Sequence, residues 1–260
     1  MENFSANPSD IKKIGVDKIK SEVSDFIKYE ETLLSKFGYS FLRKIIAPII
    51  RGIWVDEVEG LHNFPKEGSA LVALNHSSYF DFLTFGSVSP RKIHFLAAEK
   101  LFKAPHWRVL MELSGQIRVD RNNPDKSKTF AHVFSALEQG RVVGIFPEGT
   151  RSADGKIQKP FNGVAKIALK AKVPVVPVGL IGTYEIMSRS DNMPKLKKAK
   201  IKIGAPHHFK EYHDIDHTDE HYEIVTERVM LSVASLAGKE YPHLKHHIIE
   251  NGEAKLKKNV

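Results

Sequence analysis

Short apolar runs alternate with helical repeats along most of the chain. Runs that fit buried or half-buried β-strands lie at residues 70–74, 92–97, 116–119, 142–146, 173–179 and 200–204. Apolar residues recur at helical spacing over residues 80–87, 105–113, 127–139, 163–171 and 221–237. This alternation is typical of an α/β fold in which helices flank a largely parallel sheet. We therefore predict a single α/β domain over residues 55–240, built on a largely parallel central sheet.

Two amphipathic segments precede this domain and predict a pair of helices. Apolar residues recur at helical spacing over residues 23–37, and Gly38 is expected to end that helix. A second apolar stripe repeats every four residues over residues 41–54, where Pro48 is expected to kink or restart the helix. The cations that lie off this stripe are Arg43, Lys44 and Arg51. The second segment fits packing on the protein's own core, and it also fits a membrane interface with its cations toward lipid headgroups.

The flanking segments complete the division of the chain. We predict a flexible polar tail over residues 1–18, an amphipathic helical membrane-association element over residues 19–54, and a basic C-terminal tail over residues 241–260. Residues 194–202 carry a run of lysines that forms a second basic patch. That patch fits either a membrane contact or the solvated face of a strand.

Composition narrows the classes of function. The chain has 260 residues, of which 42% are hydrophobic, and it contains no cysteine. The lack of cysteine excludes disulfide bonds, a thiolate nucleophile and a cysteine-ligated metal. No run approaches the roughly 18 to 20 apolar residues that cross a bilayer, and the first residues lack the apolar core of a signal peptide, so we expect no transmembrane span. The formal net charge of +8 favours anionic partners such as phosphate groups, nucleic acid or an acidic lipid surface.

The heptapeptide NHSSYFD at residues 75–81 is the first candidate for chemistry. It follows the predicted strand 70–74, and reactive groups of α/β sheets commonly lie just beyond strand ends. One interpretation is structural, with Ser78 as the N-cap of a helix and Asp81 as its capping-box partner. The other is catalytic, with Asp81 accepting a hydrogen bond from one nitrogen of His76 while the other nitrogen takes a proton. The two interpretations are compatible.

Three further segments combine a strand with charged or conformationally special residues. The sequence FPEGTRS at 146–152 follows a buried-looking strand, and it contains a glycine that lets a ligand approach and an arginine whose planar fork suits phosphate. The segment 115–121 is another strand that ends in an arginine, and 173–178 is a strand with two prolines. The structural alternatives are surface ion pairs for the first two segments and an interrupted or edge strand for the third.

In their order and spacing, these four segments resemble the glycerolipid acyltransferase family, which includes the bacterial 1-acylglycerol-3-phosphate (lysophosphatidic acid) acyltransferases. The matching blocks are the histidine–four residues–aspartate block of His76 and Asp81, the block that ends at Arg121, the block at 146–152 and the block at 173–178. The likeness covers roughly residues 55–204. It rests on the four blocks together, because any one of them is weakly specific.

The resemblance implies transfer of a fatty acyl group from a thioester, either acyl-CoA or acyl carrier protein, to the free hydroxyl of lysophosphatidic acid, giving phosphatidic acid in phospholipid biosynthesis. It implies His76 as the general base and Asp81 as the residue that orients its ring. Residues implied in binding the acceptor and its phosphate are Arg121, Glu148, Gly149, Thr150 and Arg151, with Lys159 as a further candidate. Residues implied in supporting the motifs are Asn75, Gly115, Pro147 and Pro177. Neither a metal nor a cofactor is implied beyond the thioester co-substrate.

The resemblance also bears on partners and location. An enzyme that acts on lipids meets its substrate at a bilayer, so we expect peripheral or monotopic attachment to the anionic, cytoplasmic face of a membrane. Nucleic acid is not expected, because no recognised binding motif accompanies the positive charge. One departure from the family concerns the third block, which is often followed by Phe-Lys-x-Gly, whereas this chain reads KPFNG from Lys159 to Gly163. The displaced lysine affects the expected details of acceptor binding.

Other functions stay open at this point. The same motifs serve acyltransferases of other lysolipid acceptors and lipid transacylases. A hydrolase could use His76 and Asp81 to activate water, and a non-catalytic peripheral protein could use the basic surface to bind lipid. Ser77 and Ser78 adjoin the histidine and are candidate covalent nucleophiles. Direct transfer is expected instead, because neighbours along a chain rarely have the geometry of a nucleophile and its base.

Overall fold

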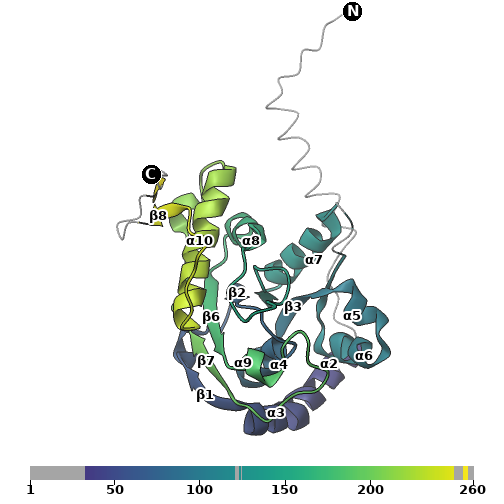
Figure 1. Cartoon of the computed structure of the whole chain (residues 1–260). Coiled ribbons are helices and arrows are strands. Elements are labelled where there is room, and N and C mark those ends of the chain that lie inside the picture. The colour runs from purple at the N-terminus through teal and green to yellow at the C-terminus, as the bar shows by residue number, and fades with distance from the viewer. Residues whose placement is uncertain (1–32, 121–122, 124, 249–253, 257–260) are drawn as a thin grey trace, which may run out of the picture.

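A seven-stranded, mostly parallel β-sheet forms the centre of the protein (Figure 1). The computed structural model describes residues 33–120, 123, 125–248 and 254–256. Within this part of the chain the strands lie side by side in the order β1 (Val55–Glu59), β7 (Ala199–Ile203), β6 (Val175–Ile181), β2 (Ala70–Leu74), β5 (Val142–Ile145), β3 (Ile93–Ala98) and β4 (Ile117–Val119). All neighbouring strands are parallel except β6 and β7. The predicted α/β domain with a largely parallel sheet is therefore confirmed.

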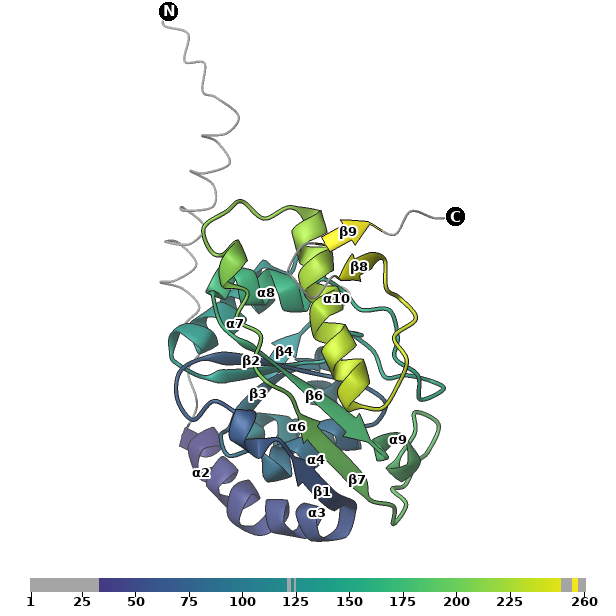
Figure 2. The same ribbon diagram turned by 90° about the vertical axis from the view of Figure 1, so that its left-hand side faces the viewer.

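Helices cover both faces of the sheet (Figures 1 and 2). They are α4 (Phe80–Val88), α5 (Glu99–Lys103), α6 (Pro105–Ser114), α7 (Ser127–Glu138), α8 (Gly163–Ala171), α9 (Thr183–Ile186) and α10 (Asp219–Leu236), with 3₁₀ turns η2 (Leu61–Asn63) and η3 (Lys210–Tyr212). Leu71 and Ala73 of β2 pack with α7, α8 and α10, whereas Val72 packs on the other face with α4. All of β2 is buried, as expected of a parallel strand covered on both faces.

The chain enters the domain through a continuous helical segment with a π-helical turn in its middle. Its parts are α2 (Leu33–Phe41), the π-helical turn η1 (Leu42–Ile46) and α3 (Ala47–Trp54). The prediction that Gly38 ends a helix is wrong, because Gly38 lies inside α2. A Cβ at Gly38 would lie 2.3 Å from Cδ2 of Leu113, so glycine lets α2 approach α6 closely. Pro48 lies in the first turn of α3, where a missing N–H costs little, and the expected irregularity beside it is the π-helical turn. The predicted elements over residues 1–32 lie outside the described residues.

One side of this helical segment is apolar and exposed. Residues at a four-residue interval form this side, hereafter the apolar stripe, and each is between 39% and 76% exposed: Phe37, Phe41, Ile45, Ile49 and Ile53. A four-residue repeat drifts by about 40° per step around a regular α-helix, and a π-helical turn reduces that drift because it winds less per residue. Elsewhere the segment packs on α4 and α6, so it contacts the core and also presents an apolar face outward. Within the described part of the chain, no helix is both long enough and apolar enough to cross a bilayer.

Polar contacts of Arg43 and Trp54 help to fix the helical segment to the domain. Arg43 donates a hydrogen bond from Nη1 to the carbonyl oxygen of Ser89. This cation therefore faces the domain, which differs from the interpretation that turned the cations of the segment toward lipid headgroups. Trp54 donates from Nε1 to the carbonyl oxygen of Lys195 at 3.1 Å, and its ring centroid lies 5.0 Å from that of Phe80. The end of α3 is therefore held against both α4 and the connection that leads into β7.

Three strands and one strand position differ from the predictions. Strand β6 lies between β7 and β2, so the interpretation of the two-proline segment as an edge strand is wrong. Pro177 precedes the antiparallel ladder with β7, which runs from Val178 to Ile181, so its missing N–H removes no bond within that ladder. Strand β1 was not predicted, and neither was the hairpin of β8 (His246–Ile248) and β9 (Ala254–Leu256), which lies within the predicted basic tail.

Candidate active site

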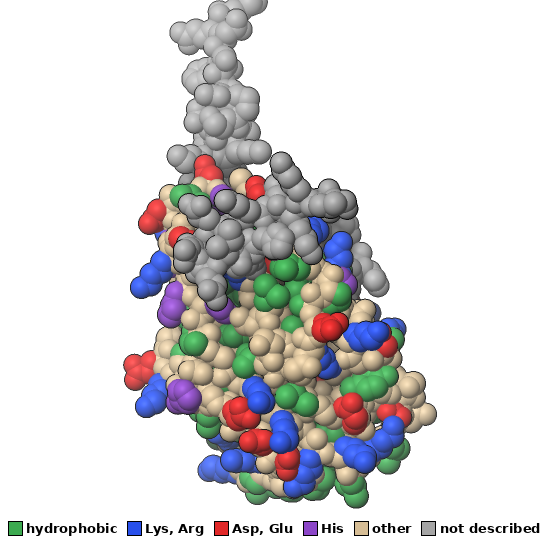
Figure 3. Space-filling model, turned by 60° about the vertical axis from the view of Figure 1, so that its left-hand side comes forward, with side chains coloured by type: hydrophobic (Ala, Val, Ile, Leu, Met, Phe, Trp, Pro, Cys, Tyr) green, Lys and Arg blue, Asp and Glu red, His purple; other side chains and the backbone are tan. Residues whose placement is uncertain are grey.

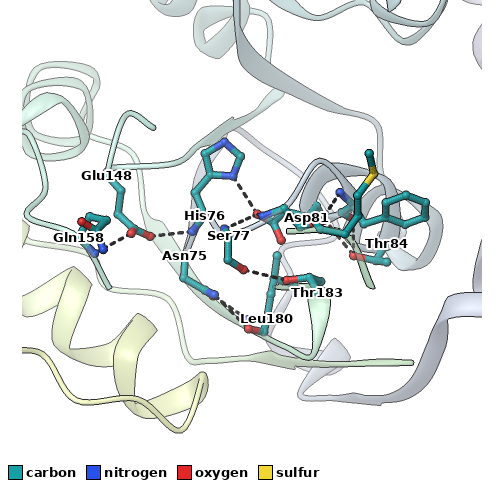
Figure 4. Close-up of polar contacts among 12 residues, drawn as sticks. Asn75, His76, Ser77, Asp81, Thr84, Glu148, Gln158, Leu180 and Thr183 are labelled. Atoms are coloured by element: carbon teal, nitrogen blue, oxygen red, sulfur yellow. Dashed lines mark hydrogen bonds and ion pairs between the residues drawn. The ribbon is translucent and has the colours of Figure 1, made fainter. Parts of the chain in front are cut away.

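The candidate site lies where three neighbouring parallel strands end. His76 follows β2, Glu148 follows β5, and Leu180 lies at the end of β6 (Figure 4). Asn75 spans the gap between two of these strands, because its Nδ2 donates to the Leu180 carbonyl oxygen at 3.0 Å and its Oδ1 accepts from the Leu180 N–H at 2.7 Å. The side chain of Asn75 thus extends the β2–β6 ladder by one rung and fixes the backbone from which His76 projects.

His76 and Asp81 form the pair that the sequence predicted. Asp81 Oδ2 lies 2.8 Å from His76 Nδ1 and also accepts the backbone N–H groups of Ser77 at 2.7 Å and Ser78 at 2.8 Å. Asp81 is fully buried, whereas the His76 side chain is 15% exposed. A carboxylate on Nδ1 favours the tautomer with its proton there, which leaves the lone pair of Nε2 to take a proton. The arrangement suits general-base chemistry at Nε2.

The predicted capping box forms only in part. Helix α4 begins at Phe80 with Tyr79 at the N-cap position, one residue later than the box requires. Asp81 does reach back to the Ser78 N–H, as one half of a capping box does. The hydroxyl of Ser78 accepts instead from the Phe80 N–H at 3.0 Å and donates to the Met187 carbonyl oxygen at 2.7 Å. The carboxylate of Asp81 therefore serves the histidine and its loop more than the helix end.

Phe146 supports the histidine ring, a role that was not predicted. The two rings stack with their centroids 4.0 Å apart and their planes at 18°. Phe95 stacks on the far side of this pair, 5.5 Å from Phe146. Phe146 is the residue directly before the Pro-Glu-Gly-Thr-Arg segment, so its place at a strand end was the available signal. A flat apolar wall restricts rotation of the imidazole and keeps Nδ1 on Asp81.

Glu148 is buried beneath the loop of residues 75–79, hereafter the histidine loop, and does not face an open site. Its Oε1 accepts the backbone N–H of His76 at 2.6 Å, and its Oε2 accepts the backbone N–H of Gln158 at 2.7 Å. The side chain is 2% exposed. Burial raises the pKa of Glu148 to about 7, although the hydrogen bonds from Gln158 and His76 oppose that rise. The expected contact of Glu148 with acceptor hydroxyls is replaced by two backbone contacts that join the histidine loop to the loop after β5.

Arg151 lies beside the histidine loop. Its guanidinium carbon is 3.5 Å from the ring centroid of Tyr79, a cation–π contact three residues after His76. The next residue, Ser152, donates its backbone N–H to the His76 carbonyl oxygen at 2.8 Å. These contacts bring a positive charge from the third sequence block to the first block, as the phosphate-binding hypothesis requires. Arg121, its predicted partner in this role, lies outside the described residues.

The other predicted residues divide between backbone support and exposed positions. Gly149 adopts a positive φ of 67° in a turn closed by its N–H on the Phe146 carbonyl oxygen. Gly115 ends α6 with a positive φ of 67°, and its carbonyl oxygen accepts from His94 Nδ1. Buried positions are held by Pro147 and Pro177, and exposed positions by Thr150 and Lys159. Across the described residues, no three histidine, aspartate or glutamate side chains gather closely enough to hold a metal ion.

The two serines next to the histidine are engaged elsewhere. The Ser77 hydroxyl lies 3.2 Å from the Thr183 hydroxyl, and Ser77 is only 2% exposed. The Ser78 hydroxyl bonds to the Phe80 and Met187 backbone, as described above. Because both hydroxyls have partners away from the imidazole, the geometry favours direct transfer over a serine-bound intermediate.

Comparison with known proteins covers the part of the chain that contains the four blocks. The chain matches the model of a family described as Acyltransferase over residues 56–181. It is 31% identical over 166 residues to the 1-acyl-sn-glycerol-3-phosphate acyltransferase of Bacillus subtilis (strain 168), covering 64% of this chain and 78% of the relative. The chain belongs to the acyltransferase family. It is therefore an enzyme of the O-acyltransferase class.

Two further relatives match more than half of this acyltransferase. This chain is 30% identical to the chloroplastic 1-acyl-sn-glycerol-3-phosphate acyltransferase LPAT1 of Arabidopsis thaliana, in a match that covers 65% of this chain and 49% of the relative. It is 33% identical to the human 1-acyl-sn-glycerol-3-phosphate acyltransferase alpha over 58% of this chain and 54% of the relative. The chain thus aligns with about half the length of these two relatives. The crystal structure of the 1-acyl-sn-glycerophosphate acyltransferase of Thermotoga maritima has the same fold, with a TM-score of 0.60 at 24% identity, covering 88% of this chain and 94% of that one.

Proposed function

We propose that this acyltransferase moves a fatty acyl group from acyl-CoA or acyl carrier protein to the free hydroxyl of 1-acylglycerol-3-phosphate, which yields phosphatidic acid for phospholipid synthesis. The printed names of the relatives support this acceptor. The observation that carries the chemistry is the 2.8 Å contact between His76 Nδ1 and Asp81 Oδ2 at the end of β2. The exposed fraction of the imidazole supports access of an acceptor to Nε2.

The proposed reaction is a direct transfer. The acceptor hydroxyl is a weak nucleophile and loses its proton to His76 Nε2 as its oxygen attacks the thioester carbonyl carbon. Asp81 stabilises the imidazolium that forms, through the hydrogen bond at Nδ1. The tetrahedral intermediate then collapses, its carbon–sulfur bond breaks, and the imidazolium returns the proton to the departing thiolate. Atoms and charges balance with the donor, the acceptor and His76 alone.

The acceptor phosphate is proposed to bind Arg151. A guanidinium presents a planar pair of donors that matches phosphate oxygens. The contact of Arg151 with Tyr79 and the bond from Ser152 to His76 hold this cation beside the proposed base, which suits an acceptor whose phosphate and hydroxyl share one glycerol. Arg121, Thr150 and Lys159 stay further candidates for the same phosphate.

An apolar groove between the helical segment and the domain is proposed to take the acyl chain. Its lining includes Leu42, Ile46, Phe82, Gly86 and Phe95. Phe95 stacks on Phe146, and Phe146 stacks on His76, so the groove begins two rings from the imidazole. Each methylene group buried there would contribute about 0.8 kcal/mol to binding, which favours a long chain over a short one.

Contact with a bilayer forms part of the same proposal, because acceptor and product are both membrane lipids. The apolar stripe of the helical segment supports shallow insertion, and the net charge of +8 supports attraction to an anionic, cytoplasm-facing leaflet. A peripheral enzyme attached in this way keeps its site near the lipid surface.

Thioester consumption by the purified full chain tests the proposal. Acyl-CoA and acyl carrier protein are supplied separately, each with 1-acylglycerol-3-phosphate, with other lysophospholipids and without acceptor. We expect thiol release to depend on the acceptor and to be fastest with 1-acylglycerol-3-phosphate. His76→Ala is expected to lower kcat by about 10² to 10⁴-fold, because general-base catalysis has that magnitude. Ser77→Ala is the matched control, and it is expected to keep most activity because its hydroxyl bonds to Thr183.

Four results would contradict different parts of the proposal. Release of fatty acid without acceptor would identify a hydrolase. Faster transfer to another lysolipid would replace the acceptor and leave the chemistry intact. An acyl adduct on Ser77 together with loss of activity in Ser77→Ala would establish a covalent route, and full activity of His76→Ala would remove the general base.

A further inference from the structure

The loop of residues 187–198, hereafter the lysine loop, connects α9 to β7 and presents two large apolar side chains to solvent. Leu196 is 83% exposed, the highest value among the large apolar residues that the structure describes, and Met193 is 75% exposed. Neither side chain packs into one of the hydrophobic cores. Two such side chains three residues apart make the loop a candidate contact surface, which its charge and its neighbours then have to support.

The lysine loop is ordered by its own polar contacts. Ser188 donates to Asp191 Oδ2 from its backbone N–H at 2.9 Å and from its hydroxyl at 2.8 Å. Lys195 Nζ lies 3.0 Å from Asp191 Oδ1, and the Lys195 N–H donates to the Ile186 carbonyl oxygen at 2.8 Å. These contacts fix the backbone on either side of Met193. Met193 and Leu196 are therefore exposed on a loop of defined conformation.

Charge separates the lysine loop from the strand that follows it. In β7 the lysines pair across the sheet with β1, Lys200 with Glu57 at 2.8 Å and Lys202 with Glu59 at 3.0 Å. Figure 3 shows acidic and basic side chains next to one another on the lower part of the face that it draws. Lys197 and Lys198 are exposed, and neither has an ion-pair partner within the described part of the chain. Of the predicted basic patch over residues 194–202, the strand lysines and Lys195 are paired with carboxylates, and Lys197 and Lys198 supply the unpaired positive charge.

The lysine loop also adjoins the helical segment and the histidine loop. Trp54, the last residue of α3, donates to the Lys195 carbonyl oxygen, and Ser78 donates to the Met187 carbonyl oxygen. Figures 1 and 2 show the connection from α9 to β7 at the same end of the molecule as α3. A surface that contacts lipid through the apolar stripe would thus bring the lysine loop to the same plane.

We propose that the lysine loop is a second lipid-contact surface, in which Met193 and Leu196 insert between lipid headgroups while Lys197 and Lys198 bind their phosphates. This inference rests on the proposed function, because it assumes that the acceptor comes from a membrane. The partner is an anionic bilayer and not a protein, since apolar side chains at a loop tip flanked by unpaired lysines suit shallow insertion with charge attraction. Two separate contacts would fix the orientation of the enzyme on the bilayer.

Sedimentation of the full chain with vesicles tests the lysine loop. The vesicles contain either phosphatidylcholine alone or phosphatidylcholine with phosphatidylglycerol. We expect Met193→Gln/Leu196→Gln to lower the partition coefficient on the anionic vesicles by about tenfold or more, because two apolar side chains no longer insert. Lys197→Gln/Lys198→Gln is expected to lower it by about fivefold per lysine on anionic vesicles, which corresponds to ~1 kcal/mol each, and to change nothing on neutral vesicles.

The matched control is Ile215→Gln. Ile215 is 48% exposed and belongs to the segment between η3 and α10. In Figure 2 this segment lies at the opposite end of the molecule from α3. Unchanged midpoints of thermal unfolding establish that the variants fold. Wild-type binding by Met193→Gln/Leu196→Gln, or an equal loss in Ile215→Gln, would overturn the inference alone. Failure of the wild-type chain to bind vesicles would overturn membrane attachment as a whole, while acceptor-dependent thioester consumption in solution would still uphold the proposed reaction.

Discussion

Substitution of Glu148 by glutamine tests whether this residue positions His76 or binds substrate. In the structure one carboxylate oxygen accepts the His76 N–H and the other accepts the Gln158 N–H, and the side chain is 2% exposed. Glutamine keeps the shape of the side chain but replaces one acceptor by an amide that cannot accept a hydrogen bond. One buried backbone N–H then loses its partner, which costs about 1 to 3 kcal/mol of stability.

The pH dependence of this effect follows from the raised pKa. The pKa of Glu148 rises from 4.5 in the unfolded chain to about 7 in the fold, so the folded chain holds the extra proton between these values. Stability falls with rising pH wherever the folded state holds more protons, and the difference between 4.5 and about 7 amounts to about 3 kcal/mol. Wild type should therefore lose about 3 kcal/mol relative to Glu148→Gln as the pH rises from 4.5 to 8. Glutamine has no proton to lose, so the variant lacks this dependence.

The assays are chemical denaturation at several pH values and steady-state kinetics. Glu138→Gln, at an exposed position in α7, is the control for the loss of a carboxylate. A misplaced imidazole lowers kcat, because a displacement of about 1 Å can cost 10²-fold, whereas KM for the acceptor stays near its wild-type value. A raised KM with normal kcat would show that Glu148 contacts the acceptor. Equal pH profiles for wild type and variant would refute the reasoning about burial.

Two further predictions concern glycines of the helical segment and its groove. Gly86→Leu should shift the preferred acyl chain toward shorter lengths, because a side chain at this position enters the apolar groove. The substitution should be tolerated, since a Cβ there would meet no atom within 4 Å. An unchanged preference in a panel of acyl-CoA lengths would place the acyl chain elsewhere. Gly38→Ala should lower the free energy of unfolding by about 1 to 3 kcal/mol, because its Cβ would meet Leu113, whereas Gly52→Ala, with open space at its Cβ, should not. Equal denaturation midpoints for the two alanine variants would mean that α2 and α6 adjust without strain.

The chemistry at the strand ends could be predicted because its signals are local. His76 and Asp81 are five residues apart, and a helix start brings their side chains together from the sequence alone. The place of Glu148 could not be predicted, because its partners are backbone N–H groups on loops 72 and 10 residues away. The local sequence does not distinguish a buried carboxylate that accepts hydrogen bonds from two backbone N–H groups from a carboxylate that faces a substrate.

Glycine and proline were ambiguous for a related reason. Gly38 was expected to end a helix, but in the structure it allows two helices to approach, and only the position of Leu113 decides between the two. Pro177 was compatible with an edge strand, yet its strand is central because the ladder with β7 begins one residue later. Each outcome depends on which element packs beside the residue, and that is a property of the tertiary fold.

The π-helical turn η1 keeps the two halves of the apolar stripe in line. Regular α-helical winding of Leu42–Ile46 at the present chain length would rotate everything before it by roughly 100° relative to α3, because the wide turn holds about one residue more than an α-helix over the same rotation. Phe37 and Phe41 would then no longer continue the line of Ile49 and Ile53, and Gly38 would turn away from α6. Loss of one residue within the turn would remove this excess and keep the apolar residues in one line, whereas regular winding without that loss would split them into two groups that point in different directions.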